Sequence, residues 1–149
     1  MRESKELLTR ILILGGCLAH FLAPGCGGDG GEGGPPRIAN LCFAPASTFV
    51  GRRGGSVGVS VSIEYADPDG DLAFIRMSTR PCGEGPVQHV DIPPGGITGS
   101  KEGVVWLSTR VTSACPAGTY LYEFTAFDRK GHPSNTLEAT FTLTPFTLN

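Results

Sequence analysis

A strict two-residue alternation between residues 56 and 65 constrains the fold of this chain more than any other feature. Apolar side chains occupy every second position, and small or polar side chains stand between them: Val57, Val59, Val61, Ile63 and Tyr65 alternate with Ser56, Gly58, Ser60, Ser62 and Glu64. Successive side chains of a β-strand point to opposite faces of the sheet, so this pattern predicts a strand with one buried and one wet face. No segment after residue 36 shows the apolar period of about 3.6 that a helix needs.

Several other segments predict strands of the same kind. We expect them at residues 38–43, 72–79, 87–92, 105–111, 120–126 and 137–143. Pro45 makes the first of these irregular, and Pro93 stops the fourth predicted strand, residues 87–92, which is short and expected at a sheet edge. Turn signals rich in Gly, Pro and Asp separate the segments. About seven short strands predict an all-β domain over residues 37–149, a single two-sheet antiparallel β-sandwich.

Residues 118–131, with the sequence GTYLYEFTAFDRKG, resemble strand F of fibronectin type III and related immunoglobulin-like domains. The resemblance covers residues 38–147 loosely, and it implies an immunoglobulin-like order of strands. It also implies that Tyr120 is the tyrosine-corner residue of such folds, whose hydroxyl bonds back to the backbone of the preceding turn. The antibody-type features are missing, because Tyr122 stands at the second Cys position and Trp106 falls in strand E.

The same resemblance implies a pairing for the cysteines of the domain. Cys82 follows the third predicted strand, and Cys115 lies between the fifth and the sixth. These two connections meet at one end of an immunoglobulin-like sandwich, whereas Cys42 is expected at the opposite end. We therefore expect a Cys82 to Cys115 disulfide, with Cys42 free or in an intermolecular bond. Three reduced cysteines remain the alternative, although an exported domain tolerates disulfides.

The first 36 residues predict export and a tether. Residues 11–23 are mostly apolar and would reach only about 20 Å as a helix, short of the ~30 Å hydrocarbon core of a bilayer, so residues 1–25 are typical of a signal peptide. Residues 22–26, with the sequence LAPGC, resemble the lipobox of bacterial lipoproteins, which implies a lipid on Cys26. Glycine, proline and acidic residues follow, so residues 26–36 predict a disordered tether. Cleavage without lipid and a chain that is not exported remain alternatives.

A lipid on Cys26 implies a protein of the cell envelope whose first partner is the membrane. Gly27 stands where some lipoproteins carry the Asp that retains them at an inner membrane. We therefore favour the outer membrane as the location, if the organism has one.

The motif DPDGD at residues 67–71 is the sharpest local signal for a ligand. Its alternate carboxylates match the start of an EF-hand calcium loop, but Leu72 and Ser78 stand where that loop needs Gly and Glu. The immunoglobulin-like order of strands places Asp128 in a loop at the same end of the sandwich. Calcium is the one cofactor this pattern suggests, and the alternative is an ordinary tight turn. The candidate ligands are Asp67, Asp69, Asp71 and Asp128.

Two function classes are disfavoured. The formal net charge is −2 and the basic residues are scattered, so a nucleic-acid partner is not expected. After residue 25 only His89 and His132 are histidines, and neither a GxSxG nor an HExxH motif occurs, so we expect no enzyme.

The remaining expectation is a binding protein. We expect a membrane-anchored, non-catalytic envelope lipoprotein whose sandwich is an adhesion or assembly module for another envelope protein. The alternative is a calcium- or glycan-binding lipoprotein that uses its B–C and F–G loops. Trp106 is expected either to cover a sheet face or to contact a ligand.

Overall fold

The structure is a computed structural model that describes residues 33–49, 55–95, 99–112 and 115–145. The predicted signal peptide, Cys26 and the tether up to residue 32 lie outside these described residues. Within the described ranges, no helix is long and apolar enough to cross a membrane. The elements in chain order are β1 (Arg37–Ala44), β2 (Ser47–Phe49), β3 (Ser56–Ala66), β4 (Leu72–Thr79), the 3₁₀ turn η1 (Pro81–Gly83), β5 (Gln88–Ile92), β6 (Glu102–Thr112), β7 (Gly118–Asp128) and β8 (Pro133–Thr144).

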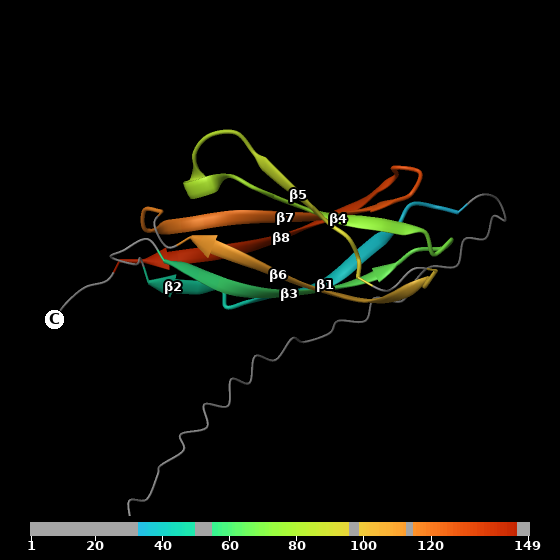
Figure 1. Cartoon of the computed structure of the whole chain (residues 1–149), viewed down its shortest axis with the longest axis horizontal. Coiled ribbons are helices and arrows are strands. Elements are labelled where there is room, and N and C mark those ends of the chain that lie inside the picture. Colours follow the sequence, from blue (N-terminus) through green and yellow to red (C-terminus); the bar gives the residue numbers. More distant parts are fainter. Residues whose placement is uncertain (1–32, 50–54, 96–98, 113–114, 146–149) are drawn as a thin grey trace, which may run out of the picture.

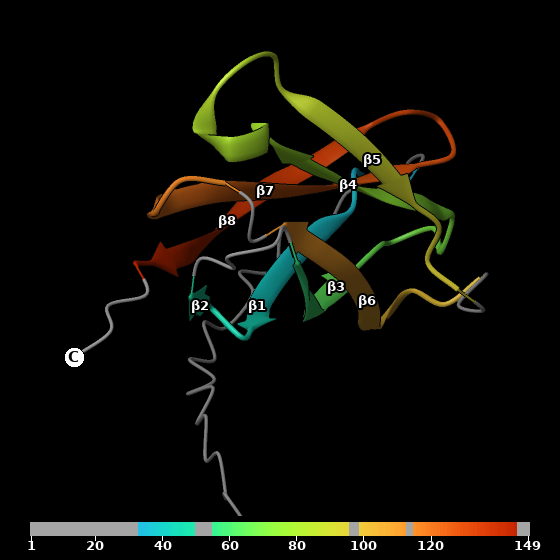
Figure 2. The same ribbon diagram turned by 60° about the vertical axis from the view of Figure 1, so that its left-hand side comes forward.

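The strands form two sheets that pack face to face (Figures 1 and 2). One sheet has the order β1-β3-β6, and the other has the order β2-β8-β7-β4-β5. The chain changes sheet at every connection except those between β4 and β5 and between β7 and β8. Neighbouring strands are antiparallel, except that β2 runs parallel to β8. This connectivity is that of an immunoglobulin-like sandwich, so the predicted fold class is confirmed.

The core lies between the two sheets and is built by alternate residues of the long strands. From β3, Val59, Val61 and Ile63 are at most 1% exposed. They face the other sheet, where Phe124 and Phe141 are fully buried. Each such side chain contributes about 1.5–3 kcal/mol through removal from water. The two-residue alternation of the sequence therefore predicted correctly which side of β3 is buried.

The first predicted strand, residues 38–43, is β1 in the structure, and a further short strand follows it. Residues 37–44 pair with β3 as β1, and after Pro45 the chain crosses to the other sheet, where β2 pairs with β8. Proline lacks the backbone N–H that a ladder needs, so the break at this point has a local cause. The sequence indicated the irregularity at Pro45 but not β2, because a strand of three residues has no alternation to reveal it.

A disulfide joins Cys82 to Cys115 at the end of the sandwich where η1 and the β6–β7 connection meet, as predicted. Tyr120 lies at the same end, and its hydroxyl donates a hydrogen bond to the backbone carbonyl of Pro116. The hydroxyl thereby ties the start of β7 to the turn before it. This is the geometry that defines a tyrosine corner.

Cys42 is not at the opposite end of the sandwich, where we expected it. It pairs with Ser62 within β3, is half-buried, and forms no disulfide with any described cysteine. The expectation failed because β1 runs along much of β3, from the pair Arg37 and Ala66 to the pair Ala44 and Ser60, so Cys42 lies well inside the strand.

Candidate metal centre

The acidic motif forms the turn between β3 and β4. The turn is closed by a hydrogen bond from the Gly70 N–H to the Asp67 carbonyl, with an N···O distance of 3.1 Å. Gly70 has φ +69°, and an added Cβ would lie 2.8 Å from the Gly99 carbonyl oxygen. Glycine is therefore required at this position for both conformation and space. The Asp67 N–H donates to the Lys101 carbonyl at 2.6 Å, which fixes the turn against the start of β6.

Three carboxylates of this turn converge. Asp67, Asp69 and Asp71 each offer an oxygen, and these oxygens all lie within 4.8 Å of one another. The structure thus brings together three of the four predicted calcium ligands.

The burial of Asp67 is the unusual feature of this cluster. The residue is 0% exposed, and neither of its carboxylate oxygens has a hydrogen-bond partner among the described residues. Asp69 and Asp71 each have one buried carboxylate oxygen that also lacks a hydrogen-bond partner among the described residues. A buried carboxylate without a partner is costly, and buried charges in proteins are normally paired or coordinate a metal. A cation at this position would supply the missing partner.

The charges of the cluster act on one another. Loss of hydration raises the pKa of Asp71 above its ordinary value of 3.8, and the negative charges of Asp69 and Asp67 raise it further. Asp128 adds to this rise, whereas Lys130 opposes it. A raised carboxyl pKa means that the site disfavours its own full ionisation while no cation neutralises it.

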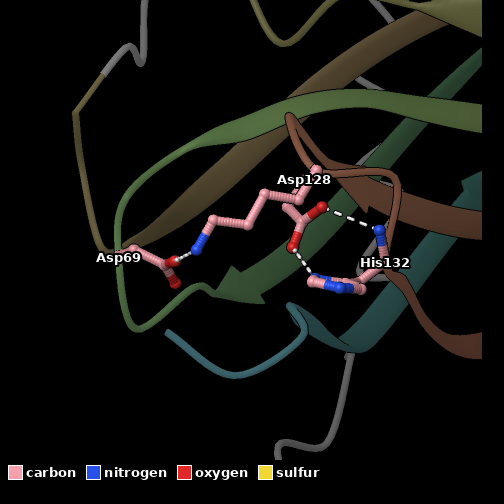
Figure 3. Close-up of polar contacts among 4 residues, drawn as sticks. Asp69, Asp128 and His132 are labelled. Atoms are coloured by element: carbon pink, nitrogen blue, oxygen red, sulfur yellow. Dashed lines mark hydrogen bonds and ion pairs between the residues drawn. The ribbon is translucent and has the colours of Figure 1, made fainter. Parts of the chain in front are cut away.

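Asp128, the fourth predicted ligand, is engaged elsewhere (Figure 3). It is 2% exposed. One of its oxygens accepts a hydrogen bond from the His132 backbone N–H at 2.7 Å, and the other lies 2.8 Å from His132 Nδ1. Burial by itself raises the pKa of Asp128, but these bonds from His132 outweigh it and hold the pKa below 3.8. The carboxylate closes the β7–β8 turn, and its oxygens are not part of the converging set.

Lys130 belongs to the surroundings of the site, although it is not among the predicted ligands. Its Nζ lies 3.4 Å from Asp69 Oδ2, the contact that a dashed line marks at Asp69 in Figure 3. The basic pair Arg129-Lys130 in the loop after strand F was the available signal, because an immunoglobulin-like order places that loop beside residues 67–71.

The donor set fits a hard divalent cation. Calcium takes six to eight oxygen ligands from carboxylates, backbone carbonyls and water, in flexible geometry. Three carboxylates could supply part of that shell, and the orphaned oxygens of Asp67 fit the role of an inner ligand. Thiolate or imidazole ligands, which softer metals prefer, do not belong to the converging set.

No protein-family profile matches the chain, and no curated protein matches it. Among solved structures, the chain is similar to the PKD domain of an M14-like peptidase from a Thermoplasmatales archaeon, with 21% identity over 74% of this chain and 96% of that chain and a TM-score of 0.46. It is also similar to a Niemann-Pick type C2 protein from the Japanese carpenter ant, with 12% identity over 83% of this chain and 100% of that chain and a TM-score of 0.45. No family assignment follows from these comparisons.

Proposed function

We propose that this protein is a calcium-binding, non-catalytic β-sandwich module of the cell envelope, held at a membrane by a lipid on Cys26. One observation carries the calcium-binding part. Asp67 is fully buried beside two other carboxylates, and neither of its oxygens has a partner among the described residues. An ordinary turn does not require a buried, unpaired carboxylate, whereas a cation site does.

The proposed site binds calcium rather than magnesium. Magnesium demands near-ideal octahedral geometry and keeps several waters, whereas calcium accepts irregular oxygen shells. Bound calcium would supply positive charge that neutralises the cluster. Asp67 would hold the ion from the protein interior, and Asp69 and Asp71 would hold it from the rim. Extracellular modules of this kind bind at about 10⁻⁴–10⁻³ M.

Isothermal titration of calcium into the full chain tests the proposal. We expect one site in the wild type and a weaker response to magnesium. Asp71→Asn should weaken binding at least about 10-fold, because it removes a ligand charge. Asp91→Asn is the matched control, since Asp91 lies outside the cluster and pairs with Arg76 at 2.7 Å. The absence of calcium binding in the wild type would refute the proposed site.

The membrane anchor is a separate part of the proposal and rests on the lipobox-like residues 22–26. Mass spectrometry of the N-terminal peptide from membrane fractions should find an acylated Cys26. Cys26→Ser should release the protein from those fractions. An unmodified N-terminus in the soluble fraction would refute the anchor and leave the calcium site untouched.

A second candidate function is docking on another envelope protein, and one surface favours it. Trp106 on β6 is 76% exposed, and Val104, two residues away on the same face, is 42% exposed. Across the sheet, Trp106 pairs with Ser62, which in turn pairs with Cys42. These neighbours have small side chains, so they do not cover the indole ring. Exposed aromatic side chains beside a sheet edge are typical of docking sites.

In-cell crosslinking compares the two sheets directly. Trp106→Ser should lose a defined crosslinked partner that the wild type retains. Leu121→Ser is the control, because Leu121 is 46% exposed on β7, in the other sheet. Equal loss in both variants, or in neither, would contradict docking through the Trp106 face.

A further inference from the structure

The chain approaches β1 directly beside the candidate metal centre. A Cβ built on Gly33 would lie 1.7 Å from Asp69 Cγ and 1.8 Å from each of the Asp69 carboxylate oxygens. No side chain fits in such a gap, so the backbone of Gly33 packs against the carboxylate itself. At Gly34, by contrast, an added Cβ would meet nothing within 4 Å.

The residues that follow fix this approach segment to the domain. Pro36 is almost fully buried, and so is Ile38 at 4% exposure. The side chain of Asn135 on β8 binds the backbone of Ile38 twice. Its Oδ1 accepts from the Ile38 N–H at 3.0 Å, and its Nδ2 donates to the Ile38 carbonyl at 2.9 Å. The residues on the C-terminal side of Gly33 are therefore held to the domain by burial and by the two hydrogen bonds of Asn135.

We infer that residues 33–36 form one wall of the cation site, so that calcium occupancy fixes where the tether leaves the sandwich. This inference rests on the proposed function. With no cation bound, Asp69 belongs to a cluster of like charges, and its Oδ1 is buried without a partner among the described residues. Its Oδ2 lies 3.4 Å from Lys130 Nζ, so the carboxylate gains by turning Oδ1 toward solvent. A cation holds that carboxylate in place, and the backbone of Gly33 then has a fixed surface to pack on. Calcium thereby orders the joint between the membrane tether and the domain.

The affinity of a matched pair of variants tests whether Gly33 belongs to the site. Gly33→Ala forces either Asp69 or the approach segment to move, and we expect calcium affinity to fall about 10-fold or more, as for other supporting contacts around a metal. Gly34→Ala changes the same tether by the same methyl group and should bind calcium as the wild type does.

Proteolysis of the full chain tests the ordering of the tether. The protease Glu-C cleaves after glutamate, and the bond between residues 32 and 33 is such a site. At 10 mM calcium we expect that bond to be cut at least about 10-fold more slowly than in EDTA. The reason is that a cation with a Kd of about 10⁻³ M or lower must dissociate before residues 33–36 can move away from Asp69. Cleavage after Glu84, an exposed residue beside η1, is the internal control and should not change.

The outcomes separate this inference from the proposed function. Calcium binding with unchanged cleavage at residue 32, or with equal affinity in Gly33→Ala, would overturn the coupling and leave the calcium site in place. No calcium binding at all would overturn both. Slower cleavage with calcium in the wild type and in Gly34→Ala, but not in Gly33→Ala, would support the coupling.

Discussion

Replacing Asp67 by Asn should change stability in opposite directions with and without calcium. In EDTA the variant should be more stable than the wild type, because the substitution removes a buried charge whose oxygens have no partner in the described structure. In calcium the difference in stability should shrink or change sign, because only the wild type retains Asp67 as the inner ligand. A substitution at an ordinary buried residue destabilises under both conditions.

The size of each Tm change follows from the cost of the buried charge and from the stabilisation that calcium binding gives to the folded state. The asparagine in Asp67→Asn keeps polar atoms without partners, so the gain is only the extra cost of burying a charge, which we take as about 1–3 kcal/mol because a charged group without a partner costs more than a neutral one. A domain of about 110 residues has an unfolding entropy of roughly 0.23 kcal/mol per kelvin, so the Tm in EDTA should rise by about 4–13 °C. For the wild type, 10 mM calcium and a Kd of about 10⁻⁴–10⁻³ M give about 1.4–2.7 kcal/mol of stabilisation, or a Tm increase of about 6–12 °C. The variant should show almost none of that increase.

Thermal unfolding followed by circular dichroism, with 1 mM EDTA or 10 mM calcium as conditions of the assay, measures both effects. Asp91→Asn again serves as the control and should keep the calcium shift of the wild type. Two results would contradict the role of Asp67 as a calcium ligand. A lower Tm of Asp67→Asn in EDTA would mean that the carboxylate has a partner in the cation-free protein. An undiminished calcium shift in the variant would mean that Asp67 is not a ligand.

Three further predictions concern the scaffold around the site. Tyr120→Phe removes the hydrogen bond to the turn before β7 and should cost about 1–1.5 kcal/mol in urea unfolding, and an unchanged midpoint would contradict the tyrosine-corner role. Replacing both Cys82 and Cys115 by Ser opens a loop with a sequence separation of 33 and should cost about 3–4 kcal/mol, checked in the same assay against the oxidised wild type. Asp128→Asn should cost about 1.5–3 kcal/mol at pH 7, because the charged acceptor of two bonds from His132 is lost. The pKa of Asp128 is lower in the folded state than its unfolded value near 3.8. The stability that the ionised carboxylate contributes is therefore present above pH 3.8 and is lost as the pH falls through the folded pKa. The difference in unfolding free energy between the wild type and Asp128→Asn should accordingly shrink below about pH 4.

The fold was predictable where local pattern and burial agree. The alternation around Ile63 predicted β3 and its buried face, because one face of that strand packs on the other sheet along its length. The pairing of Cys82 with Cys115 was expected because the resemblance to immunoglobulin-like domains implied the order of the strands. β2 was not predictable, since three residues carry no period and its pairing with β8 is a contact between segments far apart in the sequence.

The candidate site was predictable only as far as its residues are neighbours in the sequence. Asp67, Asp69 and Asp71 converge because a single turn holds them. Asp128 lies at the same end of the sandwich, but its oxygens are taken by His132, a local choice of hydrogen-bond partner that no spacing reveals. Gly33 carries no side chain and therefore no chemical signal, although its lack of one is what admits it beside Asp69.

The direction of the strands has a mechanical consequence. The described chain enters β1 at Arg37, opposite Ala66, and leaves β8 at Thr144, opposite Phe49, at the other end of the sandwich (Figure 1). Tension applied between these two points runs along the strands and loads the β1–β3 and β2–β8 ladders in shear. In shear the hydrogen bonds of a ladder must break together, whereas a peeling force breaks them one at a time. A domain with this geometry resists extension along its long axis far better than across it.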